Sequence, residues 1–163
     1  ISVCYYERLD FKEVSRELKT FKGAKRRFSE TIVGNNVVID DYAHHPNEVK
    51  ASIKAVKQKY PNKKILAIFQ PHTFTRTLEF ASDLAEVLNI ADEAYVLDIH
   101  PAREKQEDYP NVTSNLIVDK LKNGKLIKID DYDLFKNLEN TVILFMSPND
   151  ISSLENKVID IYK

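Results

Sequence analysis

The chain has 163 residues and a mass of 18.9 kDa, which is the size of one globular domain with at most a small appendage. Apolar residues make up 43% of it and include eight Phe and eight Tyr, enough for a buried core, so a disordered chain is excluded. The 24 basic and 25 acidic side chains leave a formal net charge of -1. That balance argues against nucleic acid as the partner, since domains that grip phosphate backbones carry an excess of cations.

The longest apolar runs, such as residues 142–146, are far shorter than the roughly 20 residues of a membrane-spanning helix. No signal segment opens the chain, and the single cysteine, Cys4, cannot form an internal disulfide. We therefore expect a cytoplasmic protein in a reducing compartment, with no membrane partner. Because the chain begins at Ile1 rather than Met, we also expect it to be a piece of something longer.

Residues 1–21 show helical spacing of apolar residues, with a break just before Asp10, which is a suitable N-cap for the second half. Gly23 suits the end of that helix, and a basic cluster follows at residues 25–27. We place a domain boundary at this point.

From residue 28 onward, short apolar runs alternate with helical stretches. The predicted strands are residues 31–33, 37–39, 65–69, 94–97, 126–129 and 142–146. The predicted helices are residues 49–60, 73–88, 116–121 and 154–161, with a shorter one at 132–138.

The first two strands flank the turn-prone residues 34–36 and are expected to form a hairpin. The later strands lack alternation of polar and apolar residues, which is typical of strands buried on both faces. The sequence therefore predicts an α/β fold: a Rossmann-like, doubly wound, mostly parallel sheet with an N-terminal β-hairpin and helices on both faces.

All four histidines of the chain follow predicted strands. His44 and His45 come after the second strand, His72 after the third and His100 after the fourth. Ligands of parallel sheets bind beyond the carboxyl ends of the strands, and an imidazole changes its charge near neutral pH. We therefore expect a site for a carboxylate, a phosphate or a reacting amine at this edge, although each histidine taken alone is as well explained as a loop residue.

Three further residues near this edge have a binding interpretation and a plainer one. Asp41 is placed to accept hydrogen bonds from sugar hydroxyls, or else caps a turn. Arg76, near the start of the next helix, is a rigid fork for carboxylate or phosphate, or else an exposed arginine. Arg27, in the basic cluster, contacts an anion or belongs to a solvated linker.

A metal site built from the histidines with Asp41 and Glu104 is an alternative, but no metal-ligand spacing such as His-x-His is present, so we predict none. The chain has only three glycines, Gly23, Gly34 and Gly124, and they are far apart. This excludes a phosphate-binding P-loop, a Gly-x-Gly-x-x-Gly dinucleotide turn and a Gly-x-Ser-x-Gly nucleophile elbow.

Four segments carry a family resemblance: residues 23–28, 40–48, 69–77 and 100–105, with sequences GAKRRF, DDYAHHPNE, FQPHTFTRT and HPAREK. Together they closely resemble the C-terminal part of the Mur ligases, and the His-His-Pro and Gln-Pro-His triplets are similar to the alanine-adding member. By this resemblance, residues 1–22 are a remnant of the central, ATP-binding domain with its linker. Residues 23–163 are then the C-terminal domain.

The resemblance implies an ATP-dependent ligase of peptidoglycan synthesis that joins L-alanine to UDP-N-acetylmuramate through an acyl phosphate. ATP and Mg²⁺ would be bound mainly by the missing central domain, so the fragment would be inactive alone. The C-terminal domain would close over the N-terminal and central domains of the same enzyme, excluding water.

Carried over by motif, Asp41 and Arg27 would contact the nucleotide, Asp41 at its ribose. The pocket where the muramoyl carboxyl group meets alanine would be lined by Tyr42, His44, His72 and Arg76. Of these, the residues expected to act in catalysis, by positioning and electrostatics, are His44, His72 and Arg76. His44 would touch the incoming amine, and Arg76 would counter developing negative charge.

The sequence departs from the family at two places: residues 146–150 read Met-Ser-Pro-Asn-Asp where many relatives are glycine-rich, and Thr73 stands where some relatives have Arg. Two alternative functions remain open. One is the related ligase that recycles muropeptides by attaching a preformed tripeptide. The other is a non-catalytic α/β module that binds a nucleotide or a partner.

Overall fold

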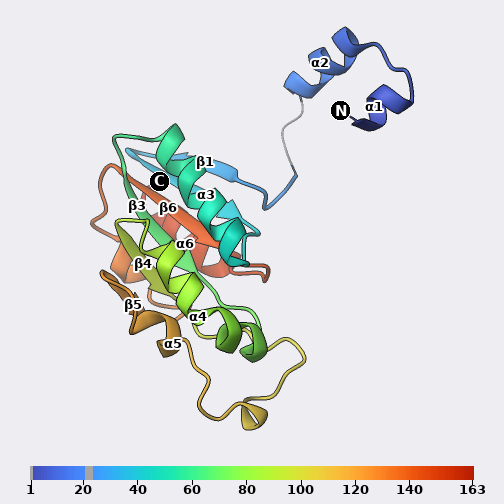
Figure 1. Ribbon diagram of the computed structural model, residues 1–163. Helices are drawn as coiled ribbons and strands as arrows, with labels where there is room; N and C mark the ends of the chain where they lie inside the picture. The colour runs from blue at the N-terminus through green and yellow to red at the C-terminus, as the bar shows by residue number, and fades with distance from the viewer. Residues whose placement is uncertain (1, 21–23) are drawn as a thin grey trace.

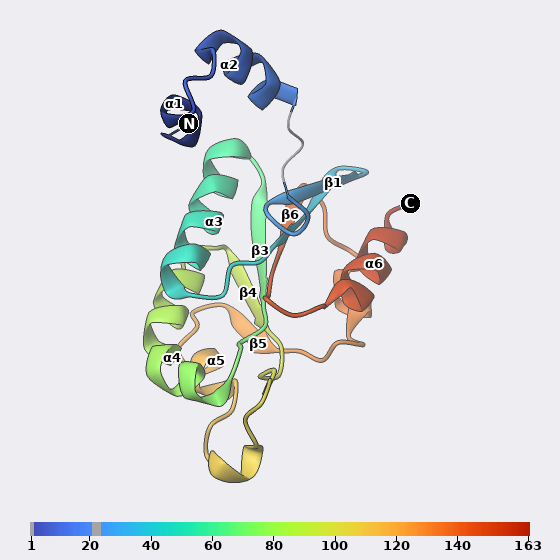
Figure 2. The same cartoon turned by 90° about the vertical axis from the view of Figure 1, so that its right-hand side faces the viewer.

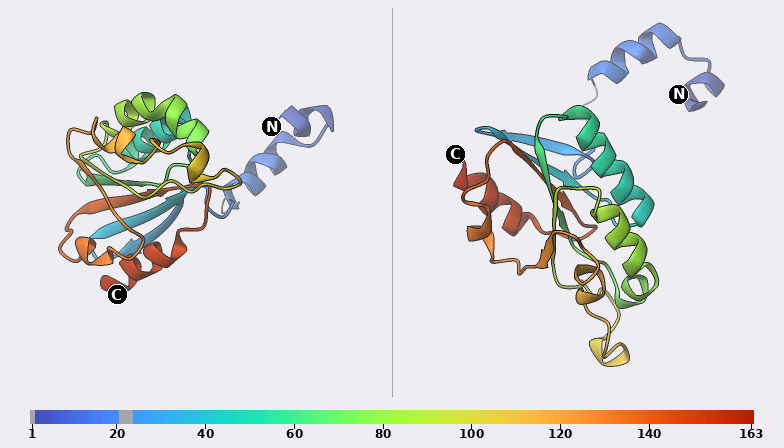
Figure 3. Two further views of the ribbon diagram at one scale, coloured as in Figure 1. Left: turned by 90° about the horizontal axis from the view of Figure 1, so that it is seen from below. Right: turned by 60° about the vertical axis from the view of Figure 1, so that its left-hand side comes forward.

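The computed structural model of the protein describes residues 2–20 and 24–163. Its main body is a six-stranded sheet between two layers of helices (Figures 1 and 3). The strand order is β1-β2-β6-β3-β4-β5, and every neighbouring pair is parallel except β1 and β2. The strands are β1 (Ser29–Val33), β2 (Asn36–Asp41), β3 (Lys64–Phe69), β4 (Glu93–Val96), β5 (Gly124–Leu126) and β6 (Thr141–Met146).

Three helices cover one face of the sheet, namely α3 (Pro46–Lys59), α4 (Phe74–Leu88) and α5 (Asn115–Val118). The other face is covered by α6 (Ser152–Ile161) and the 3-10 helix η2 (Tyr132–Phe135) (Figure 2). Each face has its own apolar core, and all six residues of the central strand β6 are buried. The predicted Rossmann-like fold is confirmed, because strands buried on both faces need helices on both sides.

The N-terminal hairpin forms as predicted, but its turn is shorter. Gly34 supplies the positive φ of 56° that the turn requires, whereas Asn36 is already the first residue of β2. Asn36 is buried because its side-chain amide donates to the carbonyl oxygen of Leu138 (2.8 Å) and accepts from the backbone N–H of Thr141 (2.9 Å). These two hydrogen bonds tie the hairpin to β6.

The strand expected at residues 126–129 is displaced: β5 begins at Gly124 and ends at Leu126. A Cβ on Gly124 would lie 2.6 Å from the carbonyl oxygen of Ala94, so only glycine allows the chain to pair with β4 there. The chain then leaves the sheet, and the next element after β5 is a 3-10 helix rather than an α-helix. The short helix expected at 132–138 is the four-residue η2.

The N-terminal segment contains two helices, α1 (Ser2–Tyr6) and α2 (Phe11–Thr20), separated as predicted. Asp10 caps α2, since its carboxylate accepts from the backbone N–H groups of Lys12 (2.7 Å) and Glu13 (3.2 Å). The predicted helix end at Gly23, and with it the domain boundary, lies outside the described residues. Within residues 2–20 and 24–163, no helix is both long and apolar enough to cross a membrane.

The topology brings four carboxyl ends to one edge of the sheet. Strands β2, β6, β3 and β4 are mutually parallel neighbours, so the loops that follow them emerge together. The helices after β2 and β3 pass to one face, whereas α6, after β6, passes to the other (Figure 2). Such a divergence opens a crevice at the carboxyl edge where ligands of doubly wound sheets bind.

Candidate active site

A row of four rings lies along this edge, contributed by the loops after three strands. The ring centroids of Tyr42 and His44 are 5.7 Å apart, those of His44 and His72 are 6.3 Å apart, and those of His72 and His100 are 5.9 Å apart. The last pair is stacked, with 7° between the ring planes, and a backbone bridge also joins these two residues. The structure therefore brings together three of the four histidines.

His72 is the most perturbed of these rings. Burial lowers its pKa below the ordinary value, and the positive charge of Arg76 and the rings of His100 and His44 lower it further. The Nδ1 atom of His72 is buried without a hydrogen-bond partner among the described residues. Buried polar atoms are nearly always paired in native proteins, and an exception with a shifted pKa is typical of functional sites.

His44 has a defined tautomer. Its Nδ1 lies 3.1 Å from the carbonyl oxygen of Tyr42, which only accepts, and 3.2 Å from a carboxylate oxygen of Glu48. Nδ1 therefore carries the hydrogen, and Nε2 of the neutral ring keeps a lone pair. This arrangement leaves Nε2 as an acceptor for an N–H group of a ligand.

The loop that carries His44 is fixed by a capping box. The Glu48 carboxylate accepts from the backbone N–H groups of His44 and His45, both at 3.1 Å, while His45 Nδ1 accepts from the N–H of Asn47. Burial acts to raise the pKa of Glu48, but these backbone hydrogen bonds hold it below its ordinary value. Pro46 occupies the first turn of α3.

His45 does not belong to the ring row. Besides capping α3, it lies edge-on against Phe80 of α4, with centroids 5.1 Å apart. Its position after a strand gave the same sequence signal as the other histidines. The path of the loop places the His44 ring in the row and the His45 ring against Phe80.

Asp41 is buried at the end of β2, only 8% exposed. One carboxylate oxygen accepts from the Ser52 hydroxyl (2.7 Å) and the other from the backbone N–H of Ala43 (3.3 Å). Among the described residues no cation pairs with it, since Arg26 pairs with Asp40 instead. Asp41 therefore stabilises the turn, which is one of the two roles that the sequence left open. A contact between Asp41 and a ribose stays a prediction, and it would use the remaining lone pairs of the carboxylate.

The basic cluster divides into two roles. Arg27 is exposed, and its guanidinium lies 4.8 Å from the ring centroid of Tyr42. Arg26 is structural: its Nε donates to Asp40 (3.2 Å) and its Nη2 donates to the carbonyl oxygens of Ser147 (2.7 Å) and Asn149 (2.5 Å). The sequence gave no signal that distinguishes these adjacent arginines.

The glycine-free loop after β6 is held at the crevice. The Ser147 hydroxyl donates to the side-chain oxygen of Gln70 (3.1 Å), and the Asn149 amide lies 3.4 Å from the same atom. With the Arg26 contacts, these hydrogen bonds fix a loop whose sequence departs from the family. Sequence reasoning missed Gln70, although its place directly after β3, next to His72, was a usable signal.

No group of three or more His, Cys, Asp or Glu able to hold a metal ion exists within the described ranges. Of the residues considered for such a site, Glu104 instead accepts from backbone N–H groups at the start of α4. Arg76 is exposed in that same first turn, close enough to His72 for its charge to lower the histidine pKa.

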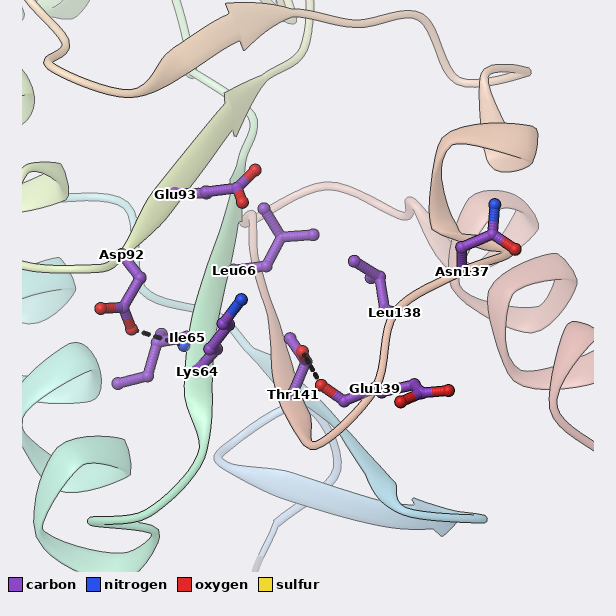
Figure 4. Close-up of a pocket in the computed structure, with 9 residues that line it drawn as sticks. All are labelled: Lys64, Ile65, Leu66, Asp92, Glu93, Asn137, Leu138, Glu139 and Thr141. Carbon is purple, nitrogen blue, oxygen red and sulfur yellow. Dashed lines mark hydrogen bonds between the residues drawn. The ribbon is translucent and has the colours of Figure 1, made fainter.

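Hollows lie at both ends of the parallel strands. One, of about 390 Å³, adjoins the ring row and is lined by Gln70, Asp98, His100, Lys128 and neighbouring residues. Another, of about 200 Å³, lies at the opposite edge, where Lys64, Glu93 and Glu139 line it (Figure 4). Polar groups there are used in hydrogen bonds of the fold, such as Asp92 accepting from the Ile65 N–H. The ring row therefore remains the candidate site.

Residues 26–151, well over half of the chain, match the family described as Mur ligase, glutamate ligase domain. The chain belongs to this family. The UDP-N-acetylmuramate-alanine ligase of Thermotoga maritima is 30% identical, with a TM-score of 0.78, over 99% of this chain and 35% of that one. The chain thus spans about a third of the length of that enzyme.

Two other Mur ligase structures are similar. A separate domain of a Haemophilus ducreyi protein, named as a UDP-N-acetylmuramate:L-alanyl-γ-D-glutamyl-diaminopimelate ligase, is 25% identical over 84% of this chain and 100% of that one, with a TM-score of 0.59. The murein peptide ligase of Psychrobacter arcticus is 20% identical, with a TM-score of 0.67, over 90% of this chain and 32% of that one, and shows the fold alone.

Proposed function

We propose that this chain is the C-terminal part of an ATP-dependent ligase that joins L-alanine to UDP-N-acetylmuramate in peptidoglycan synthesis, in the cytoplasm. The observation that carries the proposal is the similarity to the T. maritima enzyme along 99% of the chain, at 30% identity. The motifs of the ring row and of the loops around it lie within this match.

In this proposal, residues 23–163 are the C-terminal domain and residues 1–22 the end of the central domain with its linker. The N-terminal helices support this division, because apolar side chains of α1, of α2 and of the link between them are exposed, namely Val3, Tyr5, Tyr6, Leu9, Phe11 and Leu18. Exposed apolar faces of this kind are covered by further protein. The preceding part of the same enzyme is the proposed cover and the partner of this domain.

Each candidate residue has a role in the proposed reaction. The lactyl carboxylate of the sugar is activated as an acyl phosphate, and the amine of alanine displaces the phosphate. His44 Nε2 accepts a hydrogen bond from the amine, and the neutral His72 offers a second acceptor. Arg76 counters the negative charge that develops during transfer, while Tyr42 forms one wall of the pocket.

The nucleotide would be held by Arg27, the exposed cation on Tyr42, and by Asp41 at the ribose. We propose no Mg²⁺ site on this chain's own residues, because the described residues contain no group of three or more His, Cys, Asp or Glu that could hold a metal ion. We assign Mg²⁺ and most of the ATP contacts to the central domain.

The tripeptide ligase of muropeptide recycling is the second candidate. It is favoured by the similarity to the H. ducreyi domain, whose name specifies ligation of the tripeptide L-alanyl-γ-D-glutamyl-diaminopimelate. The hollow of about 390 Å³ beside His100 offers room for an acceptor larger than alanine.

A competition assay tests the proposal. The full-length enzyme is incubated with UDP-N-acetylmuramate, ATP and Mg²⁺, with alanine, glycine, serine and the tripeptide as competing amines. Alanine is expected to be the preferred acceptor, and preference for the tripeptide would establish the second candidate instead. Absence of ligation with every amine would refute both and favour a non-catalytic module.

Variants of the ring row test the residue roles in the same assay. His72→Ala and Arg76→Ala are each expected to lower the rate about ten-fold or more, since loss of one electrostatic donor costs roughly 2.7–4 kcal/mol. Glu86→Ala is the control, because Glu86 is an exposed residue of α4 outside the row. Wild-type rates for both site variants would contradict the assignment without affecting the fold.

A further inference from the structure

The first turn of α4, which carries Arg76 and directly follows His72, has a strained start. Its N-cap residue, Thr73, has φ of 65° and ψ of 147°, a conformation that β-branched residues rarely adopt. Such strain costs of the order of 1–3 kcal/mol and persists only where the surroundings enforce it. The turn that positions two candidate site residues therefore needs an external restraint.

Glu104 supplies that restraint from the loop after β4. One of its carboxylate oxygens accepts from the backbone N–H groups of Phe74 (2.6 Å) and Thr75 (3.0 Å), and the other from the Thr75 hydroxyl (2.6 Å). The carboxylate thus satisfies N–H groups that have no partner inside the helix, and it is favoured by the helix dipole.

The same loop contacts this turn at further points. The backbone N–H of Thr73 donates to the carbonyl oxygen of His100 (2.9 Å), and the hydroxyls of Thr75 and Tyr109 are hydrogen-bonded (2.9 Å). The rings of Phe74 and Tyr109 are stacked with centroids 5.7 Å apart. Glu104 is the charged centre of this set of contacts.

We propose that Glu104 is a positioning residue of the site, whose carboxylate clamps the strained first turn of α4 to the loop after β4. The clamp holds His72 against His100 and keeps Arg76 beside His72. Without it, the turn relaxes from its strained conformation, and both residues lose the geometry that the acceptor amine requires. The effect on turnover rests on the proposed ligase function, whereas the clamp itself does not.

A titration of the 163-residue chain tests the clamp directly. The chain has a core on each face of its sheet, and a related H. ducreyi domain is a solved structure by itself. In NMR spectra, the amide protons of Phe74 and Thr75 are expected to follow the ionisation of Glu104. Burial acts to raise the pKa of Glu104, but its hydrogen bonds with Thr75 and Phe74 outweigh that effect, so the midpoint lies below the ordinary 4.5.

The Glu104→Gln variant is expected to abolish that titration while leaving the amides of Phe74 and Thr75 protected from exchange, because an amide oxygen still accepts from them. The clamp would be overturned if the amide chemical shifts of Phe74 and Thr75 in the wild-type chain did not change with pH. It would also be overturned if their midpoint lay at or above the ordinary pKa of 4.5.

Turnover of the full-length enzyme tests its consequence. Glu104→Ala is expected to lower kcat about ten-fold or more, as small misplacements of reacting groups do, with little change in the KM for ATP. Glu104→Gln should recover to within about three-fold of wild type, because the amide oxygen keeps the hydrogen bonds to the turn and loses only the contribution of the charge. Glu107→Ala, in the exposed 3-10 helix η1 (Gln106–Asp108) of the same loop, is the matched control and should be unaffected.

A fully active Glu104→Ala enzyme, or a Gln variant as impaired as the Ala variant, would overturn the positioning role. Glu104→Ala that fails to fold leaves the decision to the Gln variant and to the amide titration. If the wild-type enzyme ligates none of the amines, the proposed function fails, and the amide titration still decides whether the clamp exists.

Discussion

Glu155 provides a pH-dependent test of the packing of α6. It lies half-buried near the Asp40–Arg26 pair, and burial raises its pKa to about 7 from the ordinary 4.5. The negative charge of Asp40 adds to this rise, Arg26 opposes it, and Asp150 adds to it again. Glu155 is therefore protonated in the folded chain over a range of pH where it is ionised in the unfolded chain.

The sign of the effect follows from proton binding. Between pH 4.5 and about 7 the folded state holds a proton on Glu155 that the unfolded state lacks. The free energy of unfolding therefore falls as the pH rises through this window, and the loss is complete above it. One pKa unit corresponds to about 1.36 kcal/mol, and solvent screening of a half-buried group reduces the whole loss to about 1–2 kcal/mol.

Glu155→Gln removes the ionisation and keeps the shape. In urea denaturation of the chain, the variant is expected to match the wild type near pH 4.5 and to exceed its stability by about 1–2 kcal/mol at pH 8. Glu86→Gln, the same change at an exposed position of α4, is the control and should show no such pH-dependent difference. Equal stability of wild type and Glu155→Gln at both pH values would refute the reasoning.

Two further predictions concern stability and use the same denaturation assay. Arg26→Ala is expected to lower the free energy of unfolding by about 2–3 kcal/mol, because it leaves Asp40 and two loop carbonyl groups without their donor. Arg27→Ala should lower it by no more than about 1 kcal/mol, because it removes only the contact with the Tyr42 ring. Equal losses for the two arginines would show that Arg26 has no special structural role. Gly124→Ala is expected to cost about 1–3 kcal/mol, since its Cβ would collide with the β4 backbone and with Leu121, and a tolerated alanine would show that β5 can shift.

Much of the fold could be predicted from local patterns. Unalternating apolar runs identified the central strands, and the turn at Gly34 identified the hairpin, because these features reflect burial and backbone geometry within a few residues. The predicted bounds of β5, residues 126–129, were wrong, because the start of the strand depends on close approach to Ala94 across the sheet. A contact with a strand about 30 residues earlier in the chain does not change the spacing of apolar residues, so that spacing cannot predict it.

The sequence predicted at which edge of the sheet the site lies. Chain order after parallel strands put Tyr42, His44 and His72 at one rim, since parallel strands necessarily end together. The choice between adjacent residues of the same type was not predictable. Arg26 turns into the loop after β6 while Arg27 lies on Tyr42, and the two share almost the same sequence environment.

The amino-acid order alone determined that this is a doubly wound sheet of the Mur ligase type with imidazoles along one rim. Tertiary structure decided which imidazole is partly buried with a lowered pKa, as at His72, and which caps a helix, as at His45. It also decided that Glu104 accepts hydrogen bonds from the first turn of α4 and that burial raises the pKa of Glu155 to about 7. Desolvation and charge depend on neighbours that are distant in the chain, and only folding brings these neighbours together.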